Sequence, residues 1–389
     1  MKIDPKIAAT QSDMTSWRRD IHAHPELGFQ EQRTAAKIAA LLKEFGCDVT
    51  TGLAKTGVVG TIRVGNSPRA IGLRADIDCL PMEELNGFDH RSTHKGRMHA
   101  CGHDGHTAML LGAAKYLAAT RNFEGAVHFI FQPAEEGGGG GRVMVEEGLF
   151  SKFPVDAVFG MHNRPGLDVG KFQIRSGPML AGACRFDINI TGKGGHAARP
   201  ENNIDSVLLG AHMLTALQSV RSRTLSPHEP AVISVTQFHA GDAYNVIPET
   251  AVLRGTARAF RTKTMDAIKE GMRRVASGSA ATFGAKAECV FYDGYPPLVN
   301  HEQETGFIAD IAASIVGEDN VDRNGPLVMG SEDFSYMLQA RPGAFIMIGN
   351  GHGEGGCDLH NPHYDFNDEA APLGATLFAR AVETMLAKK

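Results

Sequence analysis

Four short apolar segments constrain the fold of this chain more than any other feature. They are GVVGTI (57–62), AIGLRAD (70–76), AVHFIFQ (126–132) and DAVFGMH (156–162), and the stretch 105–119 between them is almost entirely apolar or small. The four segments are typical of strands and the longer stretch of a buried helix. Strands that are apolar along their whole length need cover on both faces, which helices provide. The segments therefore predict an α/β fold in which helices cover a mixed sheet.

The sequence pattern changes at about residue 183. From there, predicted strands and helices follow in the order strand, helix, strand, strand, helix, strand: 186–192, 203–221, 231–241, 251–260, 263–283 and 285–292. This is the order of a ferredoxin-like α+β sandwich. We therefore expect residues 183–294 to form a small domain inserted into a catalytic domain of residues 1–182 and 295–389. A chain of 389 residues is long enough for two such domains.

Charge and composition argue against several classes of function. The formal net charge is −5 and no cluster of Lys and Arg is present, so neither a nucleic acid nor an anionic membrane is an expected partner. The N-terminal segment lacks the apolar core of a signal peptide, and no window is apolar enough to span a membrane. We therefore expect a cytoplasmic protein. The six cysteines lack the close spacing of a disulfide framework, and all but Cys101 are expected to be free thiols.

A first candidate site lies in MHACGHDGH (98–106). Cys101 and His103 are two residues apart, so they point to the same side of an extended segment. Thiolate and imidazole are both good ligands for zinc-like ions. A lone Cys-x-His pair is nevertheless more often a buried cysteine near a surface histidine. It is also compatible with a cysteine nucleophile and its histidine base, so the pair alone leaves three interpretations open.

A second candidate site lies in QPAEEGGGGG (132–141), directly after a predicted strand. Ligands and catalytic groups of α/β sheets collect at the carboxyl ends of strands. Glu135 and Glu136 are adjacent, so their side chains diverge, and one can bind a metal while the other stays free as a base. The glycine run allows the backbone to approach a ligand closely. It is not a phosphate-binding loop, because the Gly-Lys-Ser/Thr sequence is missing.

Two further histidines complete a metal-binding set. His162 ends the strand after the glycine run, and His360 lies in a loop far along the chain. The proposed ligands are Cys101, His103, Glu136, His162 and His360. Five ligands exceed what one tetrahedral ion needs, so we expect two divalent ions that share a bridge, with Glu135 as the base that takes a proton from the attacking water. Zinc suits these ligands best, and manganese, cobalt or nickel could support turnover.

The same motifs resemble the zinc-dependent aminoacylase and carboxypeptidase family, in the branch of hippurate hydrolases, auxin–amino acid conjugate hydrolases and N-acetyl-diaminopimelate deacetylases. The resemblance covers almost the whole chain and extends to further motifs: RRDIHAHPELGFQE (18–31), GLRADIDCLPM (72–82), GKGGHAARP (192–200), YNVIPE (244–249), MGSEDFSYML (329–338) and LHNPHYDFND (359–368). It implies that Cys101 bridges the two metals, that Glu136 and His360 complete one site, and that His103 and His162 complete the other. The motif 18–31 is expected to be structural.

The resemblance also assigns roles outside the metal set. It implies that the inserted domain is a lid that mediates dimers, and that His196 stabilises the oxyanion, often across the dimer interface. Asn245 and Arg258 would hold the amide and the carboxylate of the substrate, although Arg258 could equally be a surface charge. Asp76 is expected to orient a histidine beside the metals. We expect a homodimer or homotetramer.

Together these features predict a metal-dependent amidohydrolase that cleaves N-acyl or N-aroyl amino acids to a carboxylic acid and a free amino acid. One alternative is a dipeptidase of the same fold, because the same machinery cleaves both kinds of amide. Another is a catalytically silent binding homologue, against which the complete ligand set and Glu135 argue. A thiol-nucleophile mechanism would instead predict activity that resists chelators and is lost on alkylation of Cys101.

Overall fold

The computed structural model describes residues 1–352 and 357–388, and it divides into two compact units. The first unit comprises Met1–Gly177, Val299–Pro326 and Asp333–Lys389. The second comprises Pro178–Leu298 and Leu327–Glu332. The second unit therefore contains the whole range 183–294 that the sequence pattern assigns to an inserted domain, and it extends a few residues beyond that range at each end.

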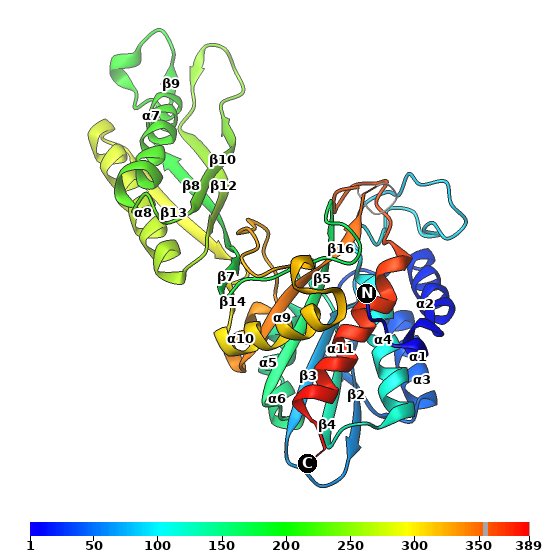
Figure 1. The fold of residues 1–389 in the computed structure, drawn as a ribbon. Coiled ribbons are helices and arrows are strands. Elements are labelled where there is room, and N and C mark those ends of the chain that lie inside the picture. The colour runs from blue at the N-terminus through cyan, green and yellow to red at the C-terminus, as the bar shows by residue number, and fades with distance from the viewer. Residues whose placement is uncertain (353–356, 389) are drawn as a thin grey trace. The chain divides into compact units, whose positions relative to one another are not determined.

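The first unit is built on an eight-stranded mixed sheet in the order β1-β2-β4-β3-β5-β16-β6-β15 (Figure 1). Its strands are β1 (Asp48–Leu53), β2 (Gly57–Val64), β3 (Ala70–Asp76), β4 (Gly125–Gln132), β5 (Ala157–Pro165), β6 (Phe172–Gln173), β15 (Val321–Asp322) and β16 (Gly343–Gly351). The central strands β4, β3, β5 and β16 run parallel to one another, while β2 pairs antiparallel with both β1 and β4. Every residue of β3, β4 and β16 is buried, as their apolar composition requires. The predicted α/β class is confirmed.

Helices cover both faces of this sheet (Figure 1). They are α1 (Pro5–Ala8), α2 (Gln11–Ala23), α3 (Gln32–Glu44), α4 (His103–Thr120), α5 (Gly140–Glu146), α6 (Leu149–Lys152), α9 (Glu302–Val316), α10 (Ser335–Ala340) and α11 (Ala371–Met385). The helix α4 packs against β3 and also against α2 and α11, which explains why it is apolar or small on almost every side. No helix within 1–352 or 357–388 is long and apolar enough to cross a membrane.

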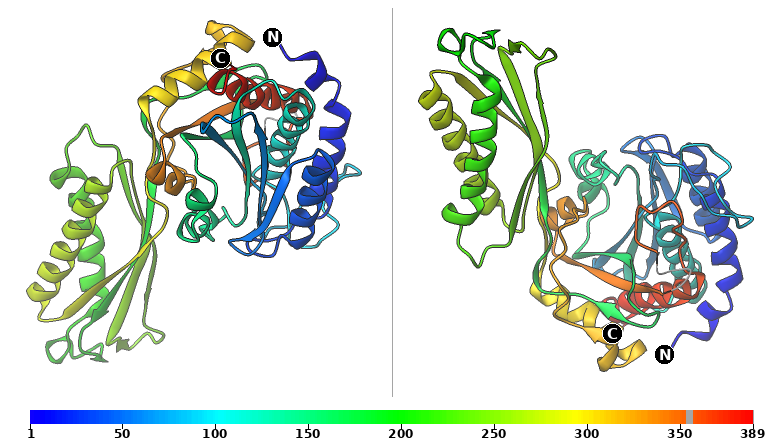
Figure 2. Two further views of the ribbon diagram at one scale, coloured as in Figure 1. Left: turned by 90° about the horizontal axis from the view of Figure 1, so that it is seen from below. Right: turned by 90° about the horizontal axis from the view of Figure 1, so that it is seen from above.

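The second unit has one four-stranded antiparallel sheet in the order β10-β12-β8-β13. Its elements follow one another as β8 (Gly182–Thr191), α7 (Ser206–Ser219), β10 (Ala231–Ala240), β12 (Thr250–Ala259), α8 (Thr262–Phe283) and β13 (Lys286–Asp293). Figure 2 shows α7 and α8 on the same face of this sheet, where Leu217, Leu253 and Ile268 belong to a separate apolar core. The order of elements is the one that the alternating sequence pattern predicts.

Short elements join the larger ones. The strands β9 (Gly195–His196) and β11 (Val246–Ile247) pair in a small ribbon beyond the four-stranded sheet. The strands β7 (Gly177–Leu180) and β14 (Leu298–Asn300) lie where the chain passes from one unit to the other.

Candidate metal centre

The segment that carries Cys101 and His103 turns sharply between these two residues. Gly102 has φ 92°, in the left-handed region that favours glycine, and directly precedes helix α4. A Cβ atom on Gly102 would lie 2.4 Å from Oδ1 of Asn163 and 2.6 Å from Oη of Tyr364. Only a glycine fits there without a collision, and this turn places the thiol and the imidazole beside the carboxyl ends of the parallel strands.

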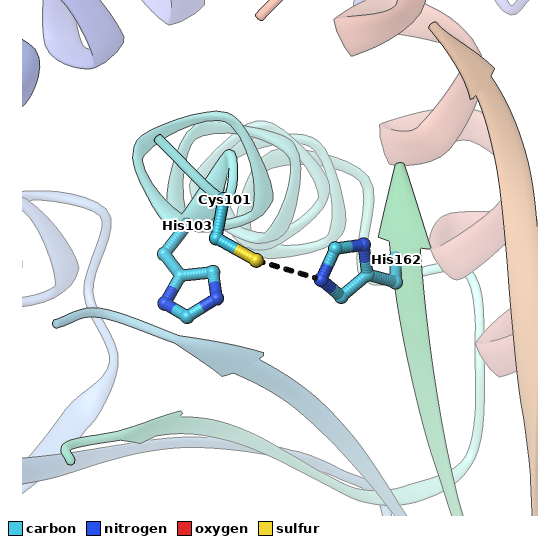
Figure 3. Close-up of side chains that lie close together, drawn as sticks. All are labelled: Cys101, His103 and His162. Carbon is cyan, nitrogen blue, oxygen red and sulfur yellow. Dashed lines mark hydrogen bonds between the residues drawn. The ribbon is translucent and has the colours of Figure 1, made fainter. Parts of the chain in front are cut away.

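Cys101, His103 and His162 lie close enough to share one metal ion (Figure 3). Each offers one ligand atom, and these three atoms lie within 4.8 Å of one another. The Sγ atom of Cys101 is 3.4 Å from Nε2 of His162. His162 comes from strand β5, His103 is the first residue of α4, and Cys101 lies two residues before that helix, so the sheet and the start of the helix together build the group.

Hydrogen bonds orient both imidazole rings of this group. Nδ1 of His162 lies 2.8 Å from the carbonyl oxygen of Asn163, to which it donates. Nδ1 of His103 lies 3.0 Å from the carbonyl oxygen of Asp78 and 3.2 Å from its Oδ1. A ring that donates through Nδ1 presents the lone pair of Nε2, which is the form of histidine that binds a metal.

The Nε2 atom of His103 tests whether a metal fits this group. The His103 side chain is 1% exposed, and its Nε2 has no hydrogen-bond partner among the residues that the structure describes. A buried polar atom without a partner is costly and rare in folded proteins. A divalent ion held between this nitrogen, the Cys101 sulfur and His162 would satisfy it, so the residues present fit a metal.

Cys101 also belongs to a second group, with Glu136 and His360, whose ligand atoms again lie within 4.8 Å of one another. Nε2 of His360 is 3.3 Å from Oε1 of Glu136. The backbone N–H of His360 donates to the carbonyl oxygen of Ala100 at 2.7 Å, which anchors this distant loop beside the thiol. The structure thus brings together all five residues proposed as ligands, and Cys101 is the member common to both groups.

Glu135 lies beside these groups. Its side chain is buried, and one of its carboxylate oxygens falls within 4.8 Å of ligand atoms of His103 and Glu136. Ala134, directly before it, has φ 54°, so the chain turns through a left-handed conformation at the point where the two glutamates begin. The next N–H along, that of Glu136, donates to Oδ2 of Asp78 at 2.9 Å.

The surroundings of Cys101 and Glu136 favour a protonated thiol and an ionised carboxylate. Burial raises the pKa of the Cys101 thiol well above its usual range, and the nearby Glu136 carboxylate raises it further. For Glu136, burial opposes ionisation, but His360 and His103 lower the pKa of this carboxyl below its usual value. A divalent ion beside the sulfur would favour the thiolate, because a coordinating thiol is deprotonated.

Asp76 contacts two histidines. Its hydrogen bond is to His106, which is not a proposed ligand, and its Oδ2 also lies 3.7 Å from Nε2 of His103, which is one. Its Oδ1 lies 2.6 Å from Nδ1 of His106, and its Oδ2 accepts from Arg74 at 2.8 Å. His106 in turn lies 2.7 Å from Oδ1 of Asn163. The residue that contacts both metal groups is Asp78, which the sequence reasoning missed. The signal was present, because Asp76 ends a buried strand and a second acidic residue, Asp78, follows it two positions later, a spacing that points both to the same side of an extended segment.

His196, expected to stabilise the oxyanion, and the expected substrate-binding residues Asn245 and Arg258 lie in the second unit. His196 and Asn245 are exposed and adjacent, since the N–H of Ala197 donates to the carbonyl oxygen of Asn245 at 3.0 Å. Arg258 is half-buried, and its Nη1 donates to Oγ of Ser331 at 3.3 Å. The ribbon with His196 follows the end of the sheet where β12 begins at Thr250. Arg258 is eight residues farther along β12, or about 27 Å at roughly 3.4 Å per residue. This unit alone does not bring Arg258 together with the other two.

Comparisons with known proteins agree with this geometry. Residues 72–384 match the peptidase family M20/M25/M40. The chain is 39% identical over 380 residues to a hippurate hydrolase of Campylobacter jejuni, covering 98% of each, and 40% identical over 382 residues to an IAA-amino acid hydrolase of Arabidopsis thaliana, covering 95% of this chain and 86% of that one. The crystal structure of the Bacillus subtilis YXEP protein, a dinuclear metal binding peptidase from the M20 family, matches with a TM-score of 0.86 and 35% identity, covering 97% of this chain and 99% of that one. The family expected from the motifs is confirmed: the chain belongs to the peptidase family M20/M25/M40, a family of hydrolases.

Proposed function

We propose that this hydrolase cleaves N-acyl or N-aroyl amino acids to a carboxylic acid and a free amino acid with the help of two divalent metal ions. The observation that carries the proposal is the buried Nε2 of His103, which has no hydrogen-bond partner among the described residues and lies within 4.8 Å of the Cys101 sulfur and a nitrogen of His162. The relatives named for hippurate and for amino acid conjugates of IAA support the substrate class.

Each metal position has its own side chains. His103 and His162 would hold one ion, Glu136 and His360 the other, and the Cys101 sulfur would bridge them. Ions bound there would polarise the carbonyl of the substrate and lower the pKa of a water molecule from about 16 to about 7. Zinc suits a set of one thiolate, three imidazoles and one carboxylate, and manganese, cobalt or nickel could replace it.

Glu135 is the proposed general base. Its carboxylate is buried beside that of Glu136, and the two adjacent glutamates take different roles in the proposal. A carboxylate oxygen of Glu135 takes the proton from the attacking water and then delivers it to the nitrogen of the leaving amino acid. Transfer to that nitrogen is needed because an amine, and not its anion, must leave.

The second unit would supply the groups that recognise the substrate. Asn245 would bind the amide, Arg258 the carboxylate through its two-pronged guanidinium, and His196 the oxyanion. His196 and Arg258 lie far apart along β12, so within one second unit they do not reach the same small substrate. This separation supports the expectation that His196 acts on the substrate of a partner subunit. A homodimer or a larger homo-oligomer is therefore part of the proposal.

A substrate panel tests this proposal. Apoprotein reconstituted with Zn²⁺, Mn²⁺ or Co²⁺ would be assayed for amino acid release from hippurate, N-acetyl amino acids, indoleacetyl amino acids and dipeptides. We expect release from at least one N-acyl or N-aroyl amino acid and little from dipeptides. Release from dipeptides alone would favour the dipeptidase alternative. No release from any substrate, with two bound ions, would contradict the proposed reaction.

A further inference from the structure

The loop that carries Glu135 and Glu136 is held by three carboxylates. The N–H of Ala134 donates to Oε1 of Glu31 at 2.9 Å, and the N–H of Glu136 donates to Oδ2 of Asp78 at 2.9 Å. At the end of the glycine run, the N–H of Gly141 donates to Oδ2 of Asp333 at 2.7 Å. The loop backbone is therefore fixed before, between and after the positions that carry out the chemistry.

Of these three carboxylates, Glu31 accepts from the residue directly before Glu135. It is fully buried, and its second oxygen, Oε2, accepts from the hydroxyl of Thr56 at 2.6 Å. It contacts none of the proposed metal ligands through these bonds. Burial raises the pKa of Glu31, while the hydrogen bonds from Thr56 and Ala134 oppose that rise. Glu31 is the last residue of the motif 18–31, which is expected to be structural.

Glu31 accepts a hydrogen bond from Ala134, a loop residue with an unusual backbone conformation. Ala134 is fully buried and has φ 54°, a conformation that residues other than glycine seldom adopt. Two glycines make room for its methyl group, since a Cβ on Gly28 would lie 3.0 Å, and one on Gly138 2.7 Å, from the Cβ of Ala134. Backbone of this kind persists only where the surroundings over-determine it, and such places cluster at functional sites.

We propose that Glu31 is a positioning residue for the hydrolytic reaction. Its carboxylate holds Ala134 in the left-handed conformation from which Glu135 and Glu136 take up their separate tasks. The inference rests on the proposed function, because it assigns Glu31 a part in the same site. Glu31 touches neither the substrate nor a metal, so it acts only through the loop.

Removal of this carboxylate would act on the loop and not on substrate binding. Without it, the buried N–H of Ala134 lacks an acceptor, and the loop can regain one only by leaving its left-handed turn. That relaxation moves Glu135 and Glu136 together. A misplacement of about 1 Å at a reacting group can cost roughly 100-fold in rate. Loss of an outer contact to a metal ligand typically weakens metal binding about 10–100-fold.

The test compares variants of Glu31 with a matched control. Glu31→Met keeps the length of the side chain but offers no acceptor, whereas Glu31→Gln keeps an acceptor for Ala134 and can donate to Thr56. Thr56→Val removes the other buried hydrogen bond of Glu31 and leaves the bond to Ala134. For each variant, kcat and KM on the best N-acyl substrate, the affinity of the apoprotein for Zn²⁺ against a competing chelator, and Tm would be measured.

We expect Glu31→Met to lower kcat roughly 100-fold with KM within about threefold of the wild type, and to weaken one Zn²⁺ site at least about 10-fold. Glu31→Gln and Thr56→Val should keep kcat within about fivefold, even where Tm falls. Wild-type kcat and Zn²⁺ affinity in Glu31→Met would overturn the inference. So would equal losses of kcat in all three variants, because these would indicate packing alone.

The experiment still decides if Glu31→Met does not fold or if the wild type shows no hydrolysis. If Glu31→Met does not fold, Glu31→Asp takes its place: its carboxylate is one methylene too short for both contacts, so a fall in kcat at unchanged KM is again expected, and unchanged kcat overturns the inference. If the wild type hydrolyses no N-acyl amino acid, the proposed function fails on its own. The Zn²⁺ affinities then still decide the inference, since weaker binding is expected for Glu31→Met and not for Thr56→Val.

Discussion

Replacement of Asp78 by alanine should weaken both metal positions at once. The Asp78 carboxylate lies 3.2 Å from Nδ1 of His103 through Oδ1, and accepts the N–H of Glu136 at 2.9 Å through Oδ2. One side chain thus orients a proposed ligand of each ion. The carbonyl oxygen of Asp78, 3.0 Å from the same Nδ1, remains in the variant, so His103 keeps one of its two acceptors.

The size of the effect follows from these contacts. Loss of an outer contact to a metal ligand costs about 10–100-fold in affinity, or roughly 1.4–2.7 kcal/mol. We expect the lower half of this range at the His103 position, where one acceptor remains, and the upper half at the Glu136 position. The N–H of Glu136, part-buried and left without its acceptor, should also lower the free energy of unfolding of the apoprotein by about 1–3 kcal/mol.

Isothermal titration of the apoprotein with Zn²⁺, in the presence of a competing chelator, measures both affinities. The matched control is Asp156→Ala, which also removes a carboxylate that accepts a backbone N–H, that of Ala70 at 2.8 Å, at the far end of β3. The control should lose stability and keep both Zn²⁺ affinities. Unchanged affinities in Asp78→Ala, or equal losses in the two variants, would refute the assignment of Asp78 as the residue that orients both groups.

Three further predictions concern the base, the turn and a buried charge. Glu135→Gln should keep two bound ions but lower kcat at least about 100-fold, as metal analysis and turnover would show, whereas near-normal turnover would contradict its role as the base. Gly102→Ala adds a methyl group where there is no room, whereas Gly96→Ala adds one in open space at a similarly positive φ of 72°. A much larger fall in Tm is expected for Gly102→Ala, and similar falls would show that the lack of room at Gly102 does not matter. Burial lowers the pKa of His22, but the charge of Asp104 and the hydrogen bonds to Asp104 and Glu84 together outweigh burial and raise this pKa to about 9. The stabilisation from protonated His22 is complete below pH of about 6.5 and is lost as pH rises through about 9. The free energy of unfolding of the apoprotein should therefore fall by on the order of 3 kcal/mol across that range, and that of His22→Gln should not. Equal dependence of the free energy of unfolding on pH in the two proteins would contradict this prediction.

The long elements of the fold could be predicted because their burial determines their composition. The strands β3 and β4 and the helix α4 are apolar along nearly their whole length, and each was expected within about three residues of its observed bounds. The strand β1 was missed because it is mostly exposed and carries the polar sequence DVTTGL. The strands β6 and β15 have two residues each, too few for any periodicity to appear in a sequence.

The sequence predicts the types of side chain in the candidate site, but not the hydrogen bonds that orient them. Thiol, imidazole and carboxylate side chains have few other uses together, so the five proposed ligands could be chosen from sequence, and the structure brings them together. The contacts of Asp78 and Glu31 could not, because a hydrogen bond to a backbone N–H leaves no mark on residue spacing. For Asp76, the sequence suggested a histidine partner, and only the fold shows that this histidine is His106.

The proposed hydrolysis depends on two metal ions held by the residues around Cys101. Apoprotein titrated with Zn²⁺ would be followed by metal analysis and by amino acid release from its best N-acyl substrate in the same samples. We expect release to appear as metal binds, to be complete at two ions per chain, and to disappear with a chelator. Activity of the apoprotein that resists a chelator and is lost on alkylation of Cys101 would contradict this expectation and favour a thiol nucleophile instead.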